Sequence, residues 1–178
     1  MALRLACLFA VTGVACLSAV ASAAHGTRAV TVARIPALPA KSESNTGRCA
    51  IPPRFRPAFE RAARDAGLQL SMLVAVAQVE SEFKPGARSQ ADARGLLQVM
   101  PTTAAELNLD ADEPSSNVLA GARYLKQMLD RFQRTDLALA AYNAGPTVVA
   151  KLGRAPTLET QTYIANVQQR WAALAGCT

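Results

Sequence analysis

Histidine and paired cysteines, the usual metal ligands, are nearly absent from this 178-residue sequence. The single histidine is His25, near the N-terminus, and no two of the four cysteines have Cys-x-x-Cys spacing. The sequence therefore offers no ligand set for a zinc site and no histidine for a Ser-His-Asp triad in a folded core. A chain of this length fits one globular domain and excludes two large ones.

The N-terminus has the pattern of a secretory signal peptide. Arg4 precedes an uncharged apolar run over 5–20, and small residues follow at 21–23. The alternative is a membrane helix, but the run is near the minimum length for a bilayer and no basic flank follows it. Gly13 stands three positions before Cys16, where a lipoprotein needs a branched apolar residue. We expect an exported protein, periplasmic or secreted, with no stable membrane anchor.

Cleavage of this leader removes two of the four cysteines and leaves Cys49 and Cys177. In an exported protein, such a pair predicts one disulfide. The chain-entropy model gives a loop of this length about 3–5 kcal/mol of stabilisation. The alternative is two free thiols, because spacing alone does not show that the two Cα atoms approach each other.

The segment after the leader is basic and has no apolar periodicity. Its charged residues are Arg28, Arg34, Lys41 and Arg48 against Glu43. It predicts a flexible arm, either attracted to an anionic wall polymer or membrane surface or simply solvated. The expected organisation is a signal peptide at 1–23, a flexible basic arm at 24–48 and a folded domain at 49–178. No motif indicates a nucleic-acid partner.

From residue 52 the pattern is helical throughout, with Gly, Pro and Asn between the segments. The sequence predicts an all-α fold. We expect helices over about 53–66, 72–83 with Ser71 as its cap, 95–100, from 102 or 103, 117–132 with Asn117 as its cap, 136 to about 145, and a last helix that buries Ile164, Val167, Trp171 and Leu174.

Glu80 is an unusual feature of the second predicted helix, because it lies on the apolar face. It follows Leu73 and Val76 in the i, i+3, i+7 pattern, whereas Glu82 falls on the opposite, polar face. Desolvation raises the pKa of a carboxyl group, which suits a general acid working near neutral pH. The alternatives are a Glu paired with a buried Arg, or one that escapes to solvent at the helix end.

Five motifs resemble those of soluble lytic transglycosylases, and they occur in the order found in that family. They begin with Glu80-Ser81-Glu82-Phe83 and its continuation to Ser89, followed by Gly95-Leu96-Leu97-Gln98-Val99-Met100-Pro101, then Asn117 to Leu125, then Ala140-Ala141-Tyr142-Asn143-Ala144-Gly145-Pro146, and finally Glu159-Thr160-Gln161-Thr162-Tyr163.

The resemblance implies a lysozyme-like helical domain whose cleft binds peptidoglycan glycan strands. It implies cleavage of the MurNAc–GlcNAc β-1,4 bond, 1,6-anhydro-MurNAc ends and no cofactor. By motif match, Glu80 is the only catalytic acid and base. The other matched positions are Ser89 near the N-acetyl group, Gln98 and Met100 lining the cleft, and Tyr142, Asn143 and Tyr163 around Glu80 and the sugar.

These supporting residues also have ordinary structural explanations. Tyr142 and Tyr163 would fit as core aromatics, and Met100 as core filling. Ser89 would fit as a turn cap, and Asn143 as a residue that ends its helix. The motifs offer no matched second carboxylate, which agrees with a mechanism in which the N-acetyl oxygen of the substrate is the nucleophile.

Asp92 is a departure from the family pattern, because members often carry Gly there. Asp tolerates a left-handed turn. As a carboxylate in this loop, it supports an alternative in which the protein is a hydrolase similar to goose-type lysozyme. An alternative of another class is a mainly non-catalytic, wall-binding assembly factor of a secretion or pilus apparatus. In each case we expect a monomer.

Overall fold

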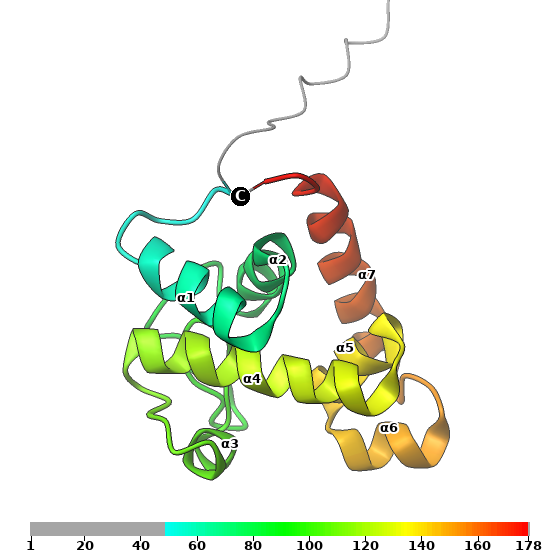
Figure 1. Cartoon of the computed structure of the whole chain (residues 1–178). Helices are drawn as coiled ribbons and strands as arrows, with labels where there is room; N and C mark the ends of the chain where they lie inside the picture. Colours follow the sequence, from blue (N-terminus) through cyan, green and yellow to red (C-terminus); the bar gives the residue numbers. More distant parts are fainter. Residues whose placement is uncertain (1–48, 178) are drawn as a thin grey trace, which may run out of the picture. The chain divides into compact units, whose positions relative to one another are not determined.

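The structure is a computed structural model that describes residues 49–177. The expected signal peptide at 1–23 and basic arm at 24–48 lie outside the described residues. Within the described part the all-α prediction is confirmed (Figure 1). Its helices are α1 (Arg56–Ala66), α2 (Leu70–Glu80), α3 (Pro101–Glu106), α4 (Pro114–Phe132), α5 (Thr135–Ala144), α6 (Pro146–Leu152) and α7 (Leu158–Ala173). No described helix is long and apolar enough to cross a membrane.

Helix α1 begins three residues later than expected and ends where expected. Pro57 has no N–H to donate to residue 53, so it lies in the first turn of the helix instead of its second. Gly67 closes the helix with φ 64°, in the left-handed region that glycine enters without strain.

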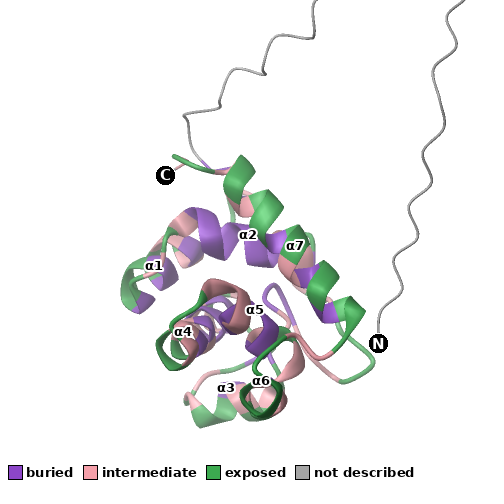
Figure 2. Cartoon of the chain, turned by 90° about the vertical axis from the view of Figure 1, so that its right-hand side faces the viewer, coloured by how far each residue is buried: buried purple, intermediate pink, exposed green. Residues whose placement is uncertain are grey.

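Helix α2 is the central helix of the domain, and the predicted polar face does not exist. Every residue from Ser71 to Ala77 is buried, in agreement with its continuous apolar sequence (Figure 2). The helix starts at Leu70 with Gln69 as its N-cap, so the prediction that Ser71 caps it was wrong. It also ends at Glu80 instead of Phe83, because Glu82 and Phe83 have φ of 51° and 61° and cannot continue a helix.

The expected helix over 95–100 is wrong. These residues form a turn, with antiparallel bridges from Arg94 to Arg88 and to Val99. Gln98 has φ 45°, outside the helical region. The next helix begins at Pro101, because proline is favoured in a first turn.

The second half of the domain is built from α4, α5, α6 and α7. Glu113, not Asn117, caps α4, because its carboxylate accepts hydrogen bonds from the N–H groups of Ser115 and Ser116. Helix α6 was not expected as a separate element and begins at Pro146. Helix α7 packs against α2 and α5, with Tyr163 and Val167 buried. Ile164, Trp171 and Leu174 are only half-buried, so the predicted buried face of this helix was partly wrong.

A disulfide joins the two ends of the described part. Cys49 and Cys177 are bonded across 128 sequence positions, with their Cα atoms 4.8 Å apart. The bridge joins the segment before α1 to the segment after α7. This pairing agrees with the sequence expectation and leaves no free thiol among the described residues.

Candidate active site

Glu80 is the last residue of α2, and it is half-buried where α2 packs against α7. The phenol of Tyr163 donates a hydrogen bond of 2.7 Å to Glu80 Oε1. Burial raises the pKa of Glu80 to about 7, and the hydrogen bond from Tyr163 opposes this rise. Glu80 therefore exchanges a proton near neutral pH, as the sequence predicted.

Neither structural alternative for Glu80 fits this geometry. Among the described residues no Arg or Lys forms an ion pair with it. It also does not escape to solvent, because the tyrosine hydroxyl holds its carboxyl group. Glu82 contrasts with it, since Glu82 is exposed and forms a 3.0 Å ion pair with Lys84, which lowers its pKa.

A small hollow of about 130 Å³ lies between α3, α4, α5 and the 98–100 segment. It is lined by Gln98, Val99, Met100, Thr103, Tyr124, Tyr142, Asn143 and Gly145. A second hollow, of about 460 Å³, is lined by Val79, Asn143, Leu158, Glu159, Thr162, Tyr163 and Asn166. Asn143 lines both hollows, and Tyr163, the partner of Glu80, lines the second. The two hollows together are called the groove below.

Tyr142 lies between the first hollow and the core. Its hydroxyl donates to the Leu97 carbonyl at 2.8 Å, and its ring lies 5.4 Å from that of Tyr124. Burial raises the pKa of both Tyr142 and Tyr163 well above its usual value, and the nearby Glu80 charge adds to this effect. Both tyrosines are therefore neutral hydrogen-bond donors near neutral pH.

The remaining matched residues differ in position. Gln98 Nε2 donates to the Ala87 and Gly95 carbonyls, so its amide braces the loop as well as lining the hollow. Met100 is 37% exposed, which excludes its alternative reading as core filling. Ser89 is exposed and lines neither hollow, and its Oγ accepts a hydrogen bond from the Ala93 N–H at 3.0 Å. The structure thus favours the turn-cap reading for Ser89.

Glu159 lines the second hollow and was missed as a site residue, although it begins the last of the matched motifs. It is exposed, at the start of α7. Leu158 beside it is 76% exposed and adds an apolar patch to the same wall. Periodicity gave no signal for either residue, because both belong to the solvent side of their helix.

Asp92 takes the left-handed conformation expected of it, with φ 69°. Its carboxylate pairs with Arg94 at 2.9 Å and with Arg88 at 3.1 Å. The hydrogen bond from Arg94 and the charges of both arginines lower its pKa. A carboxylate stabilised in this way is a weak proton acceptor, which disfavours it as a base that activates water.

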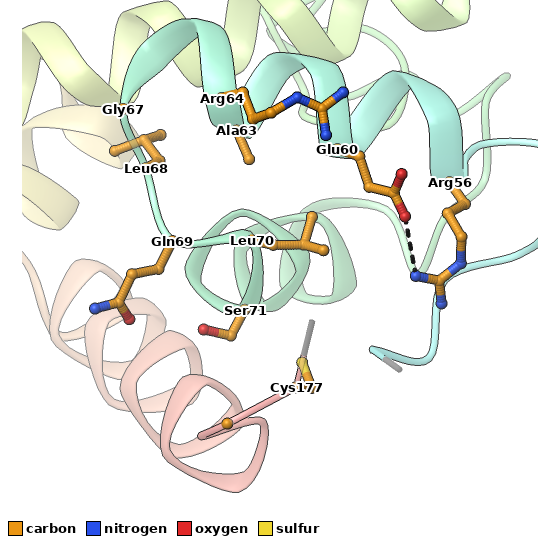
Figure 3. A pocket seen from close by; sticks show the side chains of 11 residues that line it. Arg56, Glu60, Ala63, Arg64, Gly67, Leu68, Gln69, Leu70, Ser71 and Cys177 are labelled. Atoms are coloured by element: carbon orange, nitrogen blue, oxygen red, sulfur yellow. Dashed lines mark hydrogen bonds and ion pairs between the residues drawn. The ribbon is translucent and has the colours of Figure 1, made fainter. Parts of the chain in front are cut away.

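A larger cavity, of about 840 Å³, lies at the other end of α2, between α1 and the residues Gly176 and Cys177 (Figure 3). Its polar wall includes Glu60, which pairs with Arg56 at 3.3 Å. None of the motif-matched groove residues lines it. Volume alone therefore does not identify the site. The described residues also contain no cluster of His, Cys, Asp and Glu that would hold a metal.

Residues 57–164 match the family model described as Transglycosylase SLT domain, and the chain belongs to this family. The membrane-bound lytic murein transglycosylase F of Desulfosudis oleivorans is 41% identical over 101 residues, which are 52% of this chain and 22% of that protein. The membrane-bound lytic murein transglycosylase F 1 of Alkalilimnicola ehrlichii is 36% identical over 101 residues, which are 52% of this chain and 20% of that protein.

Solved structures agree with this assignment. The fold resembles an inactive variant of lytic transglycosylase Slt from Pseudomonas aeruginosa, with a TM-score of 0.61 and 30% identity over 69% of this chain and 25% of that one. The 70 kDa soluble lytic transglycosylase of Escherichia coli has a TM-score of 0.60 and is 28% identical. The match covers 67% of this chain and 24% of that one. The fold is thus the lysozyme-like fold of lytic transglycosylases, and the chain spans about a quarter or less of these relatives.

Proposed function

We propose that this protein is a peptidoglycan lytic transglycosylase that cleaves the MurNAc–GlcNAc β-1,4 bond and leaves a 1,6-anhydro-MurNAc end. The observation that carries the proposal is Glu80, a half-buried carboxyl group with a pKa of about 7 beside a groove. Membership of the transglycosylase SLT domain family supports it. The names of the relatives, which are lytic murein transglycosylases, support the same substrate.

In the first step, protonated Glu80 gives its proton to the glycosidic oxygen as the C1–O bond breaks. The carbonyl oxygen of the MurNAc N-acetyl group attacks C1 and forms a cyclic oxazolinium intermediate. The proton leaves with the GlcNAc hydroxyl, and Glu80 is left as a carboxylate. The hydrogen bond from Tyr163 stabilises this new charge, which is the contribution expected of a donor aimed at developing charge.

In the second step, the Glu80 carboxylate accepts the proton of the C6 hydroxyl. The C6 oxygen attacks C1, opens the oxazolinium ring and forms the 1,6-anhydro bridge. Glu80 is protonated again and ready for the next bond. A pKa of about 7 suits a group that must donate a proton in one step and accept it in the next.

The groove residues supply binding. We assign the first hollow, with Gln98, Met100, Tyr142 and Asn143, to one sugar, and the second hollow, with Tyr163, to its neighbour across the scissile bond. We also propose that Ser89 contacts the N-acetyl group of the bound sugar, because its hydroxyl is exposed. The hydroxyl hydrogen of Ser89 remains available to the sugar, because Ser89 Oγ is the acceptor in its hydrogen bond with the Ala93 N–H.

The hydrolase alternative needs a second carboxylate that activates water at a defined distance from the acid. Asp92 is engaged by two arginines, and Glu159 is exposed on the groove wall. The arginines lower the pKa of Asp92, whereas burial raises the pKa of Glu80. We therefore favour internal attack by the C6 oxygen over attack by water.

A mainly non-catalytic wall-binding factor is the alternative of another class. A protein that only binds glycan has no use for a buried carboxyl that costs stability when charged. Purified sacculi separate the two proposals. We expect turnover by the native protein and at least a hundredfold loss of rate in Glu80→Gln. Glu82→Gln is the matched control, because Glu82 is exposed and paired with Lys84. Binding without turnover by the native protein would contradict catalysis.

We further propose that the protein is exported to the periplasm or secreted. The apolar run at 5–20 and the Cys49–Cys177 bridge support an oxidising compartment. Its purpose would be wall remodelling or the opening of a path for an envelope-spanning secretion or pilus apparatus. The basic segment at 24–48 would attract anionic polymers of the wall.

A further inference from the structure

A buried asparagine at the start of α4 holds the loop that carries Gln98. Asn117 is 1% exposed. Its Oδ1 accepts a 2.9 Å hydrogen bond from the Leu97 N–H, and its Nδ2 donates to the Arg94 carbonyl at 2.7 Å and the Ala111 carbonyl at 2.9 Å. Both protons of the amide nitrogen are thus used, and each partner is backbone of a loop. Asn117 lines neither hollow of the groove.

The loop packs closely against α4 at two glycines. A Cβ atom on Gly95 would lie 2.6 Å from Asn117 Nδ2, and one on Gly121 would overlap the Leu97 side chain. Gly95 also has φ 71°, which suits glycine. The two glycines therefore permit the approach, and the amide of Asn117 fixes its register.

Two further side chains hold the same loop from the direction of Glu80. Ser81, the residue after Glu80, donates from Oγ to the Leu96 carbonyl at 2.8 Å. Tyr142 donates to the Leu97 carbonyl at 2.8 Å. The loop is not a helix, so its buried backbone groups need such partners. Three side chains from separate elements provide them.

We propose that Asn117 is a positioning residue, which sets the groove wall formed by Gln98 and Met100 relative to Glu80 without touching the substrate. The inference rests on the proposed function. Gln98 has φ 45°, a conformation that a non-glycine residue keeps only when its surroundings impose it. Asn117 imposes it from both sides of the turn, because it accepts from the Leu97 N–H and donates to the Arg94 carbonyl. Loss of the bond to Arg94 would let the wall relax away from the bound sugar.

The test compares Asn117→Asp and Ser81→Ala with the native protein on soluble glycan strands. Asn117→Asp keeps the acceptor for the Leu97 N–H and loses the two N–H donors to the Arg94 and Ala111 carbonyls. Ser81→Ala removes the hydrogen bond to the Leu96 carbonyl with little change of side-chain volume. We expect KM to rise about tenfold to a hundredfold in Asn117→Asp, since small misplacements of binding groups have effects of this size. Ser81→Ala should change KM in the same direction by less. The pH at which kcat/KM falls, which the pKa of Glu80 sets, should not change.

The two variants should also be non-additive in KM, because they act through one loop. Ile51→Ala is the control for a purely structural effect, since Ile51 is a buried core residue beside the disulfide. It should lower the Tm and leave KM unchanged. If Asn117→Asp lowers only the Tm, as this control does, the positioning role is wrong. Ser81→Ala gives the same decision if Asn117→Asp does not fold.

Amide exchange separates this proposal from the proposed function. The Val99 N–H donates to the Arg94 carbonyl, which loses its bond from Asn117 in Asn117→Asp. Exchange at Val99 should therefore accelerate in Asn117→Asp while exchange in the middle of α2 stays slow, whether or not the protein cleaves glycan. A native protein without turnover would contradict the proposed function alone. Unchanged exchange at Val99 together with unchanged KM would overturn the role of Asn117.

Discussion

Tyr163 hydrogen-bonds the carboxyl group of Glu80 across 83 sequence positions, with its hydroxyl 2.7 Å from Oε1. Both side chains come from helices that pack against each other, α2 and α7. Burial raises the pKa of Glu80 and this donor lowers it, so the value of about 7 is a balance between two residues. The balance can be changed one residue at a time.

The pH dependence of activity should follow this balance. The first step needs protonated Glu80, so kcat/KM should fall as pH rises through about 7. Tyr163→Phe removes a hydrogen bond that favours the carboxylate, so the pKa should rise and the falling limb should move to higher pH. Tyr124→Phe is the control, because its ring lies in the groove and no hydrogen bond joins it to Glu80. A limb that stays in place or moves down in Tyr163→Phe would contradict the assignment.

The same pKa predicts a stability effect with a definite sign. Glu80 titrates near 4.5 when unfolded and near 7 when folded, so folding favours its protonated form. This contribution is complete below pH 4.5 and is lost as pH rises through about 7. Between these limits the native protein should lose up to about 3 kcal/mol of unfolding free energy relative to Glu80→Gln.

Urea unfolding of both proteins at pH 4.5 and pH 8 checks this. The unfolding free energy of Glu80→Gln minus that of the native protein should be larger at pH 8 than at pH 4.5. Glu82→Gln is the control, because the pKa of Glu82 is lowered, not raised. Parallel pH profiles of the native protein and Glu80→Gln would mean that Glu80 is not desolvated in the folded state.

The sequence predicted the burial of Glu80 for a partly wrong reason. The apolar periodicity predicts a helix with one polar face, but α2 is buried almost all round and ends at Glu80. The stop depends on positive φ at Glu82 and Phe83, which no periodicity reveals. The 95–100 segment was mistaken for a helix because the partners of its backbone, such as Asn117, are remote in sequence. The local apolar pattern therefore predicts most of the helices. The geometry around Glu80 depends instead on hydrogen bonds between residues remote in sequence, which a local pattern does not reveal.

Two substitutions test whether any other carboxylate takes part in the chemistry. Asp92→Asn and Glu159→Gln should each keep activity within about threefold of the native value, since a single acid and base suffices in this account. Arg94 would lose a partner in Asp92→Asn, so its Tm is measured alongside. A loss of a hundredfold or more in either variant, with wall binding retained, would assign that residue as the base of a hydrolase.

The Cys49–Cys177 bridge should be present in the exported protein and should stabilise it. The native protein should show no alkylatable thiol by intact mass, and the same spectrum should place the mature N-terminus near Ala24. Cys177→Ser should lower the unfolding free energy by about 3–5 kcal/mol in the chain-entropy model. Two alkylatable thiols in the native exported protein would contradict the bridge.

The mass of the muropeptides released from purified sacculi tests the central claim most directly. Lytic transfer by Glu80 predicts anhydro-muropeptides, which lack one water relative to hydrolase products and have no reducing end. Borohydride should leave their masses unchanged, and Glu80→Gln should release none above background. Products that are one water heavier and gain two hydrogens on borohydride treatment would show hydrolysis and contradict the account.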